Sequence, residues 1–221
     1  MQIKAILFDI DGTLVDSNDM HVDAWKEAFS RIGVTIEQNV IHDQIGKGAD
    51  MLLPALLPDL DDLGREKLGE AHNDIFKAKY RSDVQPFPQA HDLLAHVDRL
   101  GQKVVLASSA SQDDLDYYLD LLGVRDLIAA TTSSRDVKNT KPAPDIFSTA
   151  LSKVKGISAS EAIVVGDTPY DIEAARKCGI ATVAVRSGRF TDEVLVEAGA
   201  VAIYDDVAAL LGDYERSPLG E

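Results

Sequence analysis

The feature that most constrains the fold is an apolar run over residues 3–10, which carries Asp9 near its end and is followed by Asp11 and Gly12. The run predicts a short buried strand, where charged side chains are rare because an unpartnered buried charge is very costly. Side chains two positions apart in a strand point the same way, so the two carboxylates converge at its carboxyl end. Open α/β sheets bind ligands at that end. The segment therefore predicts an α/β fold with an acidic site at one sheet edge.

From residue 86 onward, apolar strand-like runs alternate with amphipathic helices of about 10–12 residues. This alternation predicts a doubly wound parallel sheet covered by helices on both faces. Strands are expected at 3–10, 103–108, 126–131, 162–166, 181–185 and 201–204. Helices are expected near 88–100, 112–122, 143–153, 170–178, 192–198 and 207–211. The tail, residues 214–221, lacks periodicity and is expected to fray.

A helical segment separates the first strand from the rest of the predicted sheet. Residues 20–32 carry apolar side chains at three- and four-residue spacings, which are typical of a helix. Residues 35–80 stay helix-like and show no convincing strand, with Pro54 and Pro58 expected to break the region. The strand order of the sheet is therefore interrupted by an all-helical insertion.

Two domains follow from this interruption. We expect an α/β core made of residues 1–16 and 86–221, and a helical cap domain made of residues 17–85. The connections at 16–18 and 83–88 are candidate hinges. The alternative is a helical layer that packs permanently on the sheet, since domain contacts within a chain are often fixed.

Composition narrows the class of protein. The chain has 221 residues and is 45% hydrophobic, enough for a sizeable core. Its net charge of −15 argues against nucleic acid as a partner, because nucleic acids bind basic surfaces. Cys178 is the single cysteine, so no internal disulfide can form and a reducing, cytoplasmic location is expected.

No signal peptide or long apolar run is present, so we expect no membrane span. Acidity indicates nothing about oligomeric state.

Four predicted strand ends carry polar residues that are expected to meet at one edge of the sheet. Taken alone, a serine after a strand is usually a turn residue, and a lysine before a proline is usually a solvated surface residue. It is their repeated placement at strand ends that favours a common site. The residues are Asp9 with Asp11, Ser108, Lys141, and Asp167 with Asp171.

In this order the residues resemble the four motifs of the haloacid-dehalogenase-like hydrolase superfamily: D-x-D-G-T, a Ser or Thr, a Lys before Pro, and G-D-x-x-x-D. The matching segments are residues 9–13, Ser108, Lys141 with Pro142, and residues 166–171. The chain length and the helical insertion resemble the phosphoglycolate phosphatase and β-phosphoglucomutase branch. The resemblance covers the chain up to its tail and implies a Rossmann-like core with an inserted cap.

The resemblance implies a phosphoryl-transfer site. Asp9 would attack phosphorus and form an aspartyl phosphate. Asp11 would protonate the leaving oxygen and then deprotonate the attacking water, which requires a raised pKa in the loaded site. Ser108 would donate its hydroxyl to a phosphoryl oxygen. Lys141, held at a helix entrance by Pro142, would balance the charges of the nucleophile and the phosphoryl group.

The same resemblance implies a metal site. An oxygen-only site beside a phosphate suits Mg²⁺, which keeps several waters. The expected ligands are the Asp9 carboxylate, the Asp11 backbone carbonyl and Asp167. Asp171 is expected to act through water or a hydrogen bond, or simply to favour the helix dipole as a first-turn acid.

Other residues near the aspartate pair are candidates for substrate binding. Gly12 and Thr13 allow a sharp turn and would offer exposed amides to an anionic oxygen. Ser109 would add a second hydroxyl, although hydroxyls near strand ends often bond local backbone. Asp16 is interpreted as solvent-facing, or as a helix cap together with Ser17.

Two residues of the insertion are candidates for reading the substrate. His21 matches a histidine often found in this branch after the first hinge, and would touch substrate or bridge to Asp11. A cap or packed histidine is the alternative. Lys47 lies in a Gly-Lys-Gly turn where family members have a specificity loop, and a solvated lysine is its alternative. Trp25 and Phe29 share an apolar helical face and are expected in the core.

Three functions remain for comparison: a Mg²⁺-dependent phosphatase acting on small phosphate monoesters, a phosphosugar mutase using the same aspartyl phosphate, and a non-catalytic binding protein on the same fold. The third is disfavoured because unpaired buried carboxylates without a task are expensive. A carbon–halogen hydrolase is disfavoured because the related dehalogenases lack the second aspartate, here Asp11. The phosphatase is preferred because Asp-Gly-Thr resembles the hydrolases.

Overall fold

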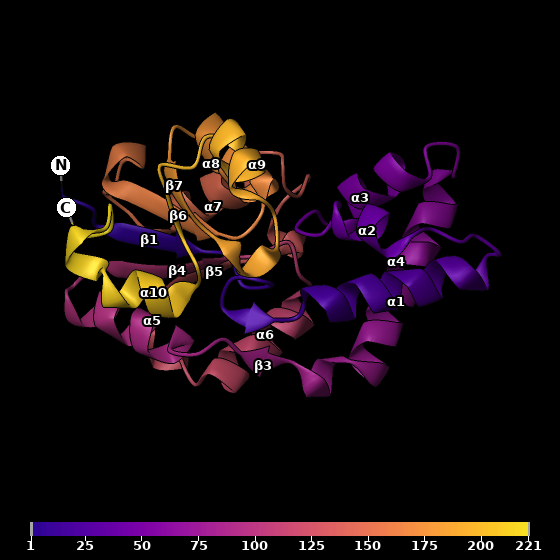
Figure 1. The fold of residues 1–221 in the computed structure, drawn as a ribbon, viewed down its shortest axis with the longest axis horizontal. Helices are drawn as coiled ribbons and strands as arrows, with labels where there is room; N and C mark the ends of the chain where they lie inside the picture. The colour runs from indigo at the N-terminus through magenta and orange to yellow at the C-terminus, as the bar shows by residue number, and fades with distance from the viewer. Residues whose placement is uncertain (1, 221) are drawn as a thin grey trace.

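A six-stranded parallel sheet forms the centre of the computed structural model, which describes residues 2–220 (Figure 1). The strand order β5-β4-β1-β6-β7-β8 places β1, the first strand of the chain, between β4 and β6. The order reverses on either side of β1, so its carboxyl end is the switch point where ligands bind in such sheets. The strands are β1 Ala5–Phe8, β4 Lys103–Ala107, β5 Ile128–Thr132, β6 Ala162–Gly166, β7 Ala181–Val185 and β8 Ala202–Tyr204. The predicted doubly wound fold is confirmed.

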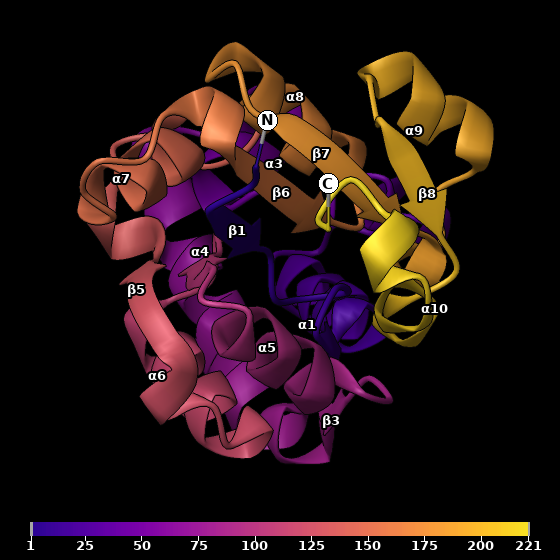
Figure 2. The same ribbon diagram turned by 90° about the vertical axis from the view of Figure 1, so that its left-hand side faces the viewer.

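Both faces of β1 are buried, because alternate side chains enter two separate apolar clusters. Ala5 and Leu7 pack with α7 Asp145–Lys153 and α8 Pro169–Lys177. Ile6 and Phe8 face the opposite cluster, to which α5, α6 and α10 contribute (Figure 2). These helices are α5 Ala90–Arg99, α6 Gln112–Leu122 and α10 Val207–Gly212, and α9 Asp192–Ala198 packs on the outer side of α8. The continuously apolar strands predicted from the sequence are thus covered on both sides.

The first four α-helices of the chain form a block at one end of the molecule (Figure 1). Trp25 and Phe29 on its first helix are buried and share the apolar cluster with Ile75 and Phe76 of its fourth. Both aromatic side chains were expected in the core. The helices, called the helical block below, are α1 Asn18–Arg31, α2 Gln38–His42, α3 Ala49–Leu56 and α4 Asp62–Lys79.

The two connections to the helical block pair with each other. β2 Val15–Asp16 and β3 Gln85–Pro86 form a two-stranded antiparallel ribbon. The segments expected to be separate hinges are therefore joined by backbone pairing. Asp16 is exposed, as expected, but Ser17 is fully buried and makes no side-chain cap hydrogen bond. Ser17 occupies the N-cap position of α1 as expected, but the expectation that its side chain caps the helix was wrong, because its hydroxyl bonds to Asp11 instead.

Two further expectations were wrong. Pro54 does not break the chain but lies inside α3, where a proline removes only one backbone hydrogen bond of a short helix. Residues 214–220 of the tail are packed rather than frayed, since Tyr214 and Leu219 are buried. The Tyr214 hydroxyl donates to Gln102 Oε1 at 2.5 Å, and Gln102 Nε2 donates to the Leu219 carbonyl at 2.9 Å. One buried amide thus anchors a segment that has no periodicity of its own.

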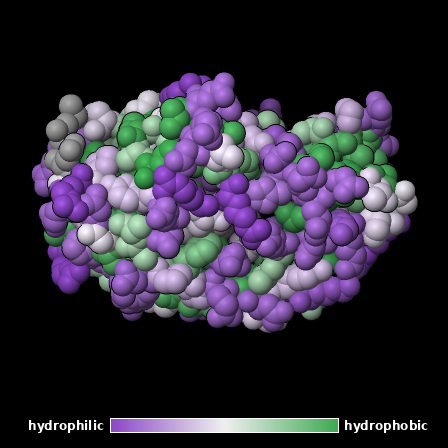
Figure 3. Space-filling model, in the orientation of Figure 1, coloured by the Kyte–Doolittle hydropathy of each residue, from purple (hydrophilic) through white to green (hydrophobic). Residues whose placement is uncertain are grey.

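Hydrophilic residues predominate on the face drawn in Figure 3, and hydrophobic ones are confined to patches between them. Five charged residues are nevertheless buried within the described residues, namely Asp9, Asp114, Lys141, Asp167 and Asp171. Within residues 2–220, the helices are all too short or too polar to cross a bilayer.

Candidate active site

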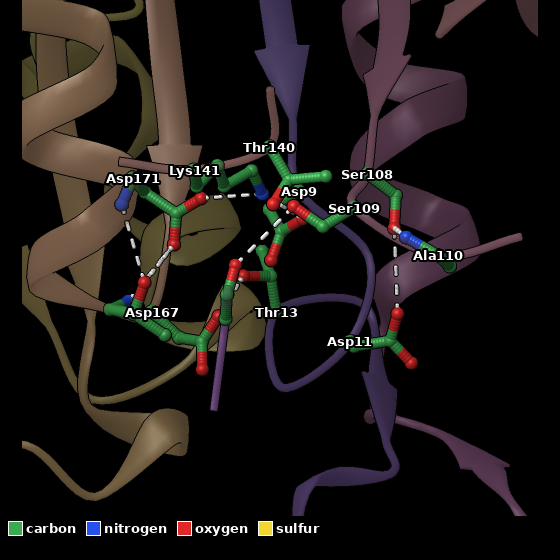
Figure 4. Close-up of polar contacts among 12 residues, drawn as sticks. Asp9, Asp11, Thr13, Ser108, Ser109, Ala110, Thr140, Lys141, Asp167 and Asp171 are labelled. Atoms are coloured by element: carbon green, nitrogen blue, oxygen red, sulfur yellow. Dashed lines mark hydrogen bonds and ion pairs between the residues drawn. The ribbon is translucent and has the colours of Figure 1, made fainter. Parts of the chain in front are cut away.

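Side chains from separate segments converge beyond the carboxyl ends of the central strands (Figure 4). Asp9 follows β1, Ser108 follows β4 and Asp167 follows β6. Lys141 comes from the loop that leads into α7 and reaches to the end of β1. The four predicted motifs therefore lie at one edge of the sheet, as parallel strands require.

Lys141 is a buried cation held between two buried carboxylates. Its ammonium lies 2.5 Å from Asp9 Oδ1 and 2.7 Å from Asp171 Oδ1, and its side chain is fully buried. Burial by itself would lower the pKa of Lys141, but the charges of Asp171 and Asp9 outweigh it and raise that pKa. Burial raises the pKa of Asp9 well above its ordinary value. Lys141 thus stays charged beside the carboxylate predicted to be the nucleophile.

Asp167 is held by donors from the β1–α1 segment. Thr13 Oγ1 donates to its Oδ1 at 2.8 Å, and Asn18 Nδ2 donates to its Oδ2 at 3.0 Å. Burial and the charge of Asp171 nevertheless raise the pKa of Asp167 to about 7. A Cβ on Gly188, in the loop after β7, would lie 2.2 Å from Asp167 Oδ2, so only glycine leaves room for this carboxylate.

The donor set fits a divalent cation. Carboxylate oxygens of Asp9, Asp167 and Asp171 lie within 4.8 Å of one another, and all three residues are buried. Lys141 supplies a single positive charge to these acids. Burial raises the pKa values of Asp9 and Asp167, and the charges of neighbouring aspartates raise them further, so a hard cation would relieve negative charge at this position. Asp171 also caps α8 through Thr168, so its expected helix-terminal role is present alongside the Lys141 contact.

Asp11 turns its carboxylate away from the other acids. Ser17 Oγ donates to its Oδ1 at 2.6 Å, and His21 Nε2 lies 3.1 Å from the same oxygen. Burial would raise the pKa of Asp11, but the hydrogen bonds from His21 and Ser17 outweigh it and lower that pKa to about 2. The expected bridge from His21 to Asp11 is therefore present. The raised pKa expected of Asp11 refers to the loaded site, and in the absence of substrate these hydrogen bonds keep its pKa low.

Two of the expected substrate contacts are contradicted. The Gly12 amide donates to the Val15 carbonyl at 2.8 Å, and the Thr13 amide donates to the Ile10 carbonyl at 3.1 Å. Neither amide is free for an anion, because the turn itself uses both. Thr13 is fully buried and serves Asp167, whereas Gly12 adopts a φ of 79°, the left-handed conformation that favours glycine.

A cavity of about 330 Å³ opens above Asp9 and Asp11, between the strand ends and the helical block. Ser108 is buried in its wall, 3.5 Å from Asp11 Oδ2, and accepts a hydrogen bond from the Ala110 amide. Ser109 Oγ points to the Gly46 carbonyl at 3.4 Å. Lys47 lines the cavity, but its ammonium contacts Gln44 and lies 4.4 Å from the centre of the Tyr170 ring. This one cavity is bordered by six of the predicted site residues: Asp9, Asp11, His21, Lys47, Ser108 and Ser109.

Several residues of the site carry no signal in the sequence. Asn18 and Asp50 look like ordinary first-turn helix residues, and His72 looks like one more residue of a long helix. Asn18 contacts Asp167, while His72 Nε2 lies 3.4 Å from His21 Nδ1 and stacks on Trp25. The Asn18 contact joins the helical block to the core, whereas the His72 contacts join α4 to α1 within the helical block.

His72 gives a prediction for stability against pH. It is buried, and desolvation together with the nearby His21 lowers its pKa to about 3 from an ordinary 6.5. The unfolded chain therefore binds a proton that the folded chain rejects, so stability is complete above pH 6.5 and is lost as pH falls toward 3. This single group should cost about 2 kcal/mol between pH 7.5 and pH 5. Urea unfolding of His72→Phe at both pH values should show a pH dependence smaller by that amount. An unchanged dependence would exclude a neutral buried His72.

Known proteins resemble this chain over most of its length. The sequence pattern of the family described as haloacid dehalogenase-like hydrolase matches residues 6–185. A phosphoglycolate phosphatase of Rhodospirillum rubrum is 27% identical over 228 residues, which cover 97% of this chain and 92% of the relative. SUPPRESSOR OF QUENCHING 1, a chloroplastic protein of Arabidopsis thaliana, is 30% identical over 213 residues, which cover 93% of this chain but only 20% of that longer relative. Among solved structures, a hydrolase from Pseudomonas syringae is 31% identical with a TM-score of 0.91, covering 98% of this chain and 99% of the other.

Proposed function

Because the chain belongs to the haloacid dehalogenase-like hydrolases, we propose that it is a phosphatase that releases phosphate from small phosphorylated metabolites. The observation that carries this proposal is the pairing of Asp9, which borders the cavity, with the fully buried Lys141 at the end of β1. Phosphoryl transfer depends on positioning and charge neutralisation, and a carboxylate beside a permanently charged ammonium supplies both.

Asp9 is the proposed nucleophile. A new bond forms between its carboxylate oxygen and phosphorus while the bond from phosphorus to the leaving oxygen breaks. Lys141 balances the charge that spreads over the phosphoryl oxygens, and Ser108 donates its hydroxyl to one of them. Water then attacks phosphorus and restores the free carboxylate of Asp9.

Asp11 is the proposed acid and base. It gives a proton to the leaving oxygen in the first step and takes one from the attacking water in the second. The pKa of about 2 set by His21 and Ser17 favours its base form. A dianionic phosphate in the cavity would raise that pKa, since like charges disfavour ionisation. His21 Nε2 contacts Asp11 Oδ1 and is placed to fix the orientation of the Asp11 carboxylate.

The metal is proposed to be Mg²⁺. Asp9, Asp167 and the Asp11 backbone carbonyl would hold it, and Asp171 would act mainly by fixing Lys141. When bound, Mg²⁺ would neutralise the negative charge that develops on the phosphoryl oxygens. Its role rests on the excess of buried carboxylates over ammonium groups at this edge of the sheet.

Removal of the metal should abolish turnover. EDTA is expected to reduce phosphate release by at least about 100-fold, and Mg²⁺ in excess should restore it. Ca²⁺ is the informative replacement, because its longer and more flexible coordination should support binding but little turnover. Release of phosphate from an aryl phosphate is the readout. Undiminished turnover after chelation, with the metal content checked by atomic absorption, would argue against this role.

We further propose that residues 17–85 are a cap domain on a core of residues 1–16 and 86–221. The helical block supports this, since it closes the cavity with His21 and Lys47. The leaving group would lie against this block, and the cation of Lys47 would meet an anionic or hydroxylated substrate at the cavity mouth. The single cysteine supports a reducing, cytoplasmic location.

A screen of phosphorylated metabolites tests the function. Phosphoglycolate and hexose phosphates head the set, because a relative is a phosphoglycolate phosphatase and the cavity mouth carries a lysine. Release of inorganic phosphate supports the phosphatase, whereas conversion between sugar-phosphate isomers without release would favour the mutase. No reaction with any monoester, including aryl phosphates, would contradict the proposal.

A further inference from the structure

A two-oxygen contact joins the helical block to the residue that precedes Lys141. Asp50, in the first turn of α3, accepts from the Thr140 amide at 2.9 Å and from the Thr140 hydroxyl at 2.5 Å. The same hydroxyl accepts a hydrogen bond from the Gly48 amide at 2.9 Å. A Cβ at Gly48 would lie 2.6 Å from Thr140 Oγ1, so glycine permits the close approach. Three hydrogen bonds therefore meet at one core residue.

Thr140 depends on the helical block for these partners. Its side chain is 96% buried, with a relative exposure of 4%, and its carbonyl is used locally by the Ala143 amide at 2.9 Å. Within residues 2–220, its amide and hydroxyl bond only to residues 48 and 50 of the helical block. Buried backbone and hydroxyl groups are nearly always paired, so withdrawal of this segment would leave Thr140 to find new partners.

The position of Thr140 affects the position of Lys141, because Lys141 is the next residue in the chain. Its ammonium must reach Asp9 and Asp171 together, at 2.5 and 2.7 Å, from a loop rather than from a helix or strand. Thr140 and Asp9 both border the cavity, and Figure 4 draws them together with Lys141. The Gly46 carbonyl of the same turn contacts Ser109, which adjoins Ser108. One turn of the helical block thus contacts the sequence neighbours of two site residues.

We propose that Asp50 is a positioning residue, which holds the Lys141 ammonium against Asp9 by fixing Thr140 when the helical block lies on the sheet. This inference rests on the proposed function, which gives Lys141 its task. The Lys141 ammonium would then be held in place only when the helical block closes the substrate cavity. Lys141 would therefore neutralise charge in a site from which water is excluded, where electrostatic stabilisation is strongest.

Variants at both ends of the contact test the inference. Thr140→Val removes the hydroxyl at nearly constant volume, and should lower kcat on a small aryl phosphate by about 10- to 100-fold while KM changes less than about twofold. Thr140→Ser restores the hydroxyl and should return kcat to within about threefold of the unaltered chain. Asp50→Ala should lower kcat at least as much as Thr140→Val, because it removes the acceptor of the Thr140 amide as well as that of the hydroxyl. The double variant should be less slow than the product of the two single effects, because both variants break the hydrogen bond between the hydroxyl and Asp50.

A matched control separates positioning from general loosening. Asp19 pairs with Arg189 across the other side of the interface between helical block and core, away from Lys141. Asp19→Ala should leave kcat unchanged. The inference is overturned if Thr140→Val is fully active, if Thr140→Ser is as slow as Thr140→Val, or if Asp19→Ala is equally slow. An inactive unaltered chain would instead contradict the proposed function and remove the premise, whereas an active chain with unaffected variants contradicts this inference alone.

Discussion

Asp9→Asn is expected to lower the turnover of phosphate monoesters by about 10⁴-fold or more while the fold persists. An amide at this position has no negative charge with which to attack phosphorus. The residue is 2% exposed and the substitution keeps its shape, so packing at the end of β1 should survive. Because Asp9 is a buried acid with a raised pKa, neutralising it removes a desolvation cost, and Lys141 retains Asp171 as a partner. The free energy of unfolding should therefore stay equal or rise.

The measurements are phosphate release and urea unfolding on the same preparation. Asp16→Asn is the matched control, since it makes the same change of charge at an exposed aspartate seven residues away, and it should leave turnover unchanged. Mass spectrometry must exclude deamidation, which would regenerate aspartate. Turnover of Asp9→Asn within tenfold of the unaltered chain would remove Asp9 as nucleophile. Loss of turnover together with loss of the fold would show that Asp9 is needed for structure.

What the sequence predicts well is what depends on short-range periodicity and on the convergence of parallel strands. Apolar runs define the six strands of the sheet to within about two residues, and parallel strand ends meet at one edge, so Asp9 and Asp167 are brought together. Lys141 reaches Asp9 from the loop before α7 rather than from a strand end. Neither inference requires knowing how any two helices pack. The helical block was predicted as helical for the same reason.

What the sequence could not predict depends on packing between distant segments. Asn18 reaches Asp167 across 149 positions, and Asp50 reaches Thr140 across 90. Each of these polar residues has an ordinary local explanation as a cap or a first-turn acid, and only the docked helical block gives it another. The burial of the tail could not be predicted for the same reason, because nothing in the sequence indicates that Gln102 contacts Tyr214.

Hydrogen bonds within a turn are a second feature that could not be predicted from the sequence. Gly12 and Thr13 were expected to offer amides to phosphate because a glycine after a strand end often does so. The backbone of residues 10–15 closes on itself instead and uses both donors. A motif identifies the residue types that a turn needs, but whether an amide serves the turn or a ligand depends on dihedral angles that the letters do not specify.

Lys141→Met should affect both turnover and stability. Methionine matches the length of the lysine stem but removes the ammonium that Asp9 and Asp171 share, so turnover should fall by at least about 1,000-fold. Three buried carboxylates then lack their shared counter-charge, and the free energy of unfolding at neutral pH should fall by about 3–5 kcal/mol. Lys177→Met is the control, since Lys177 contacts the same segment through the Pro142 carbonyl but has an exposed side chain.

The response of Lys141→Met to pH and Mg²⁺ decides whether its loss of stability is electrostatic. The pKa of Asp167 is already raised to about 7, so the folded chain binds protons that the unfolded chain has released above its ordinary value of 3.8. Stability from such a group is present at low pH and is lost as pH rises through the folded pKa. Without the Lys141 charge the carboxylate pKa values rise further. Lys141→Met should therefore be destabilised more at pH 8 than at pH 6, and Mg²⁺ should stabilise it more than the unaltered chain. Equal loss at both pH values, with no added response to Mg²⁺, would mean that Lys141 supports the site by packing alone, and the charge balance proposed around phosphorus would fail with it.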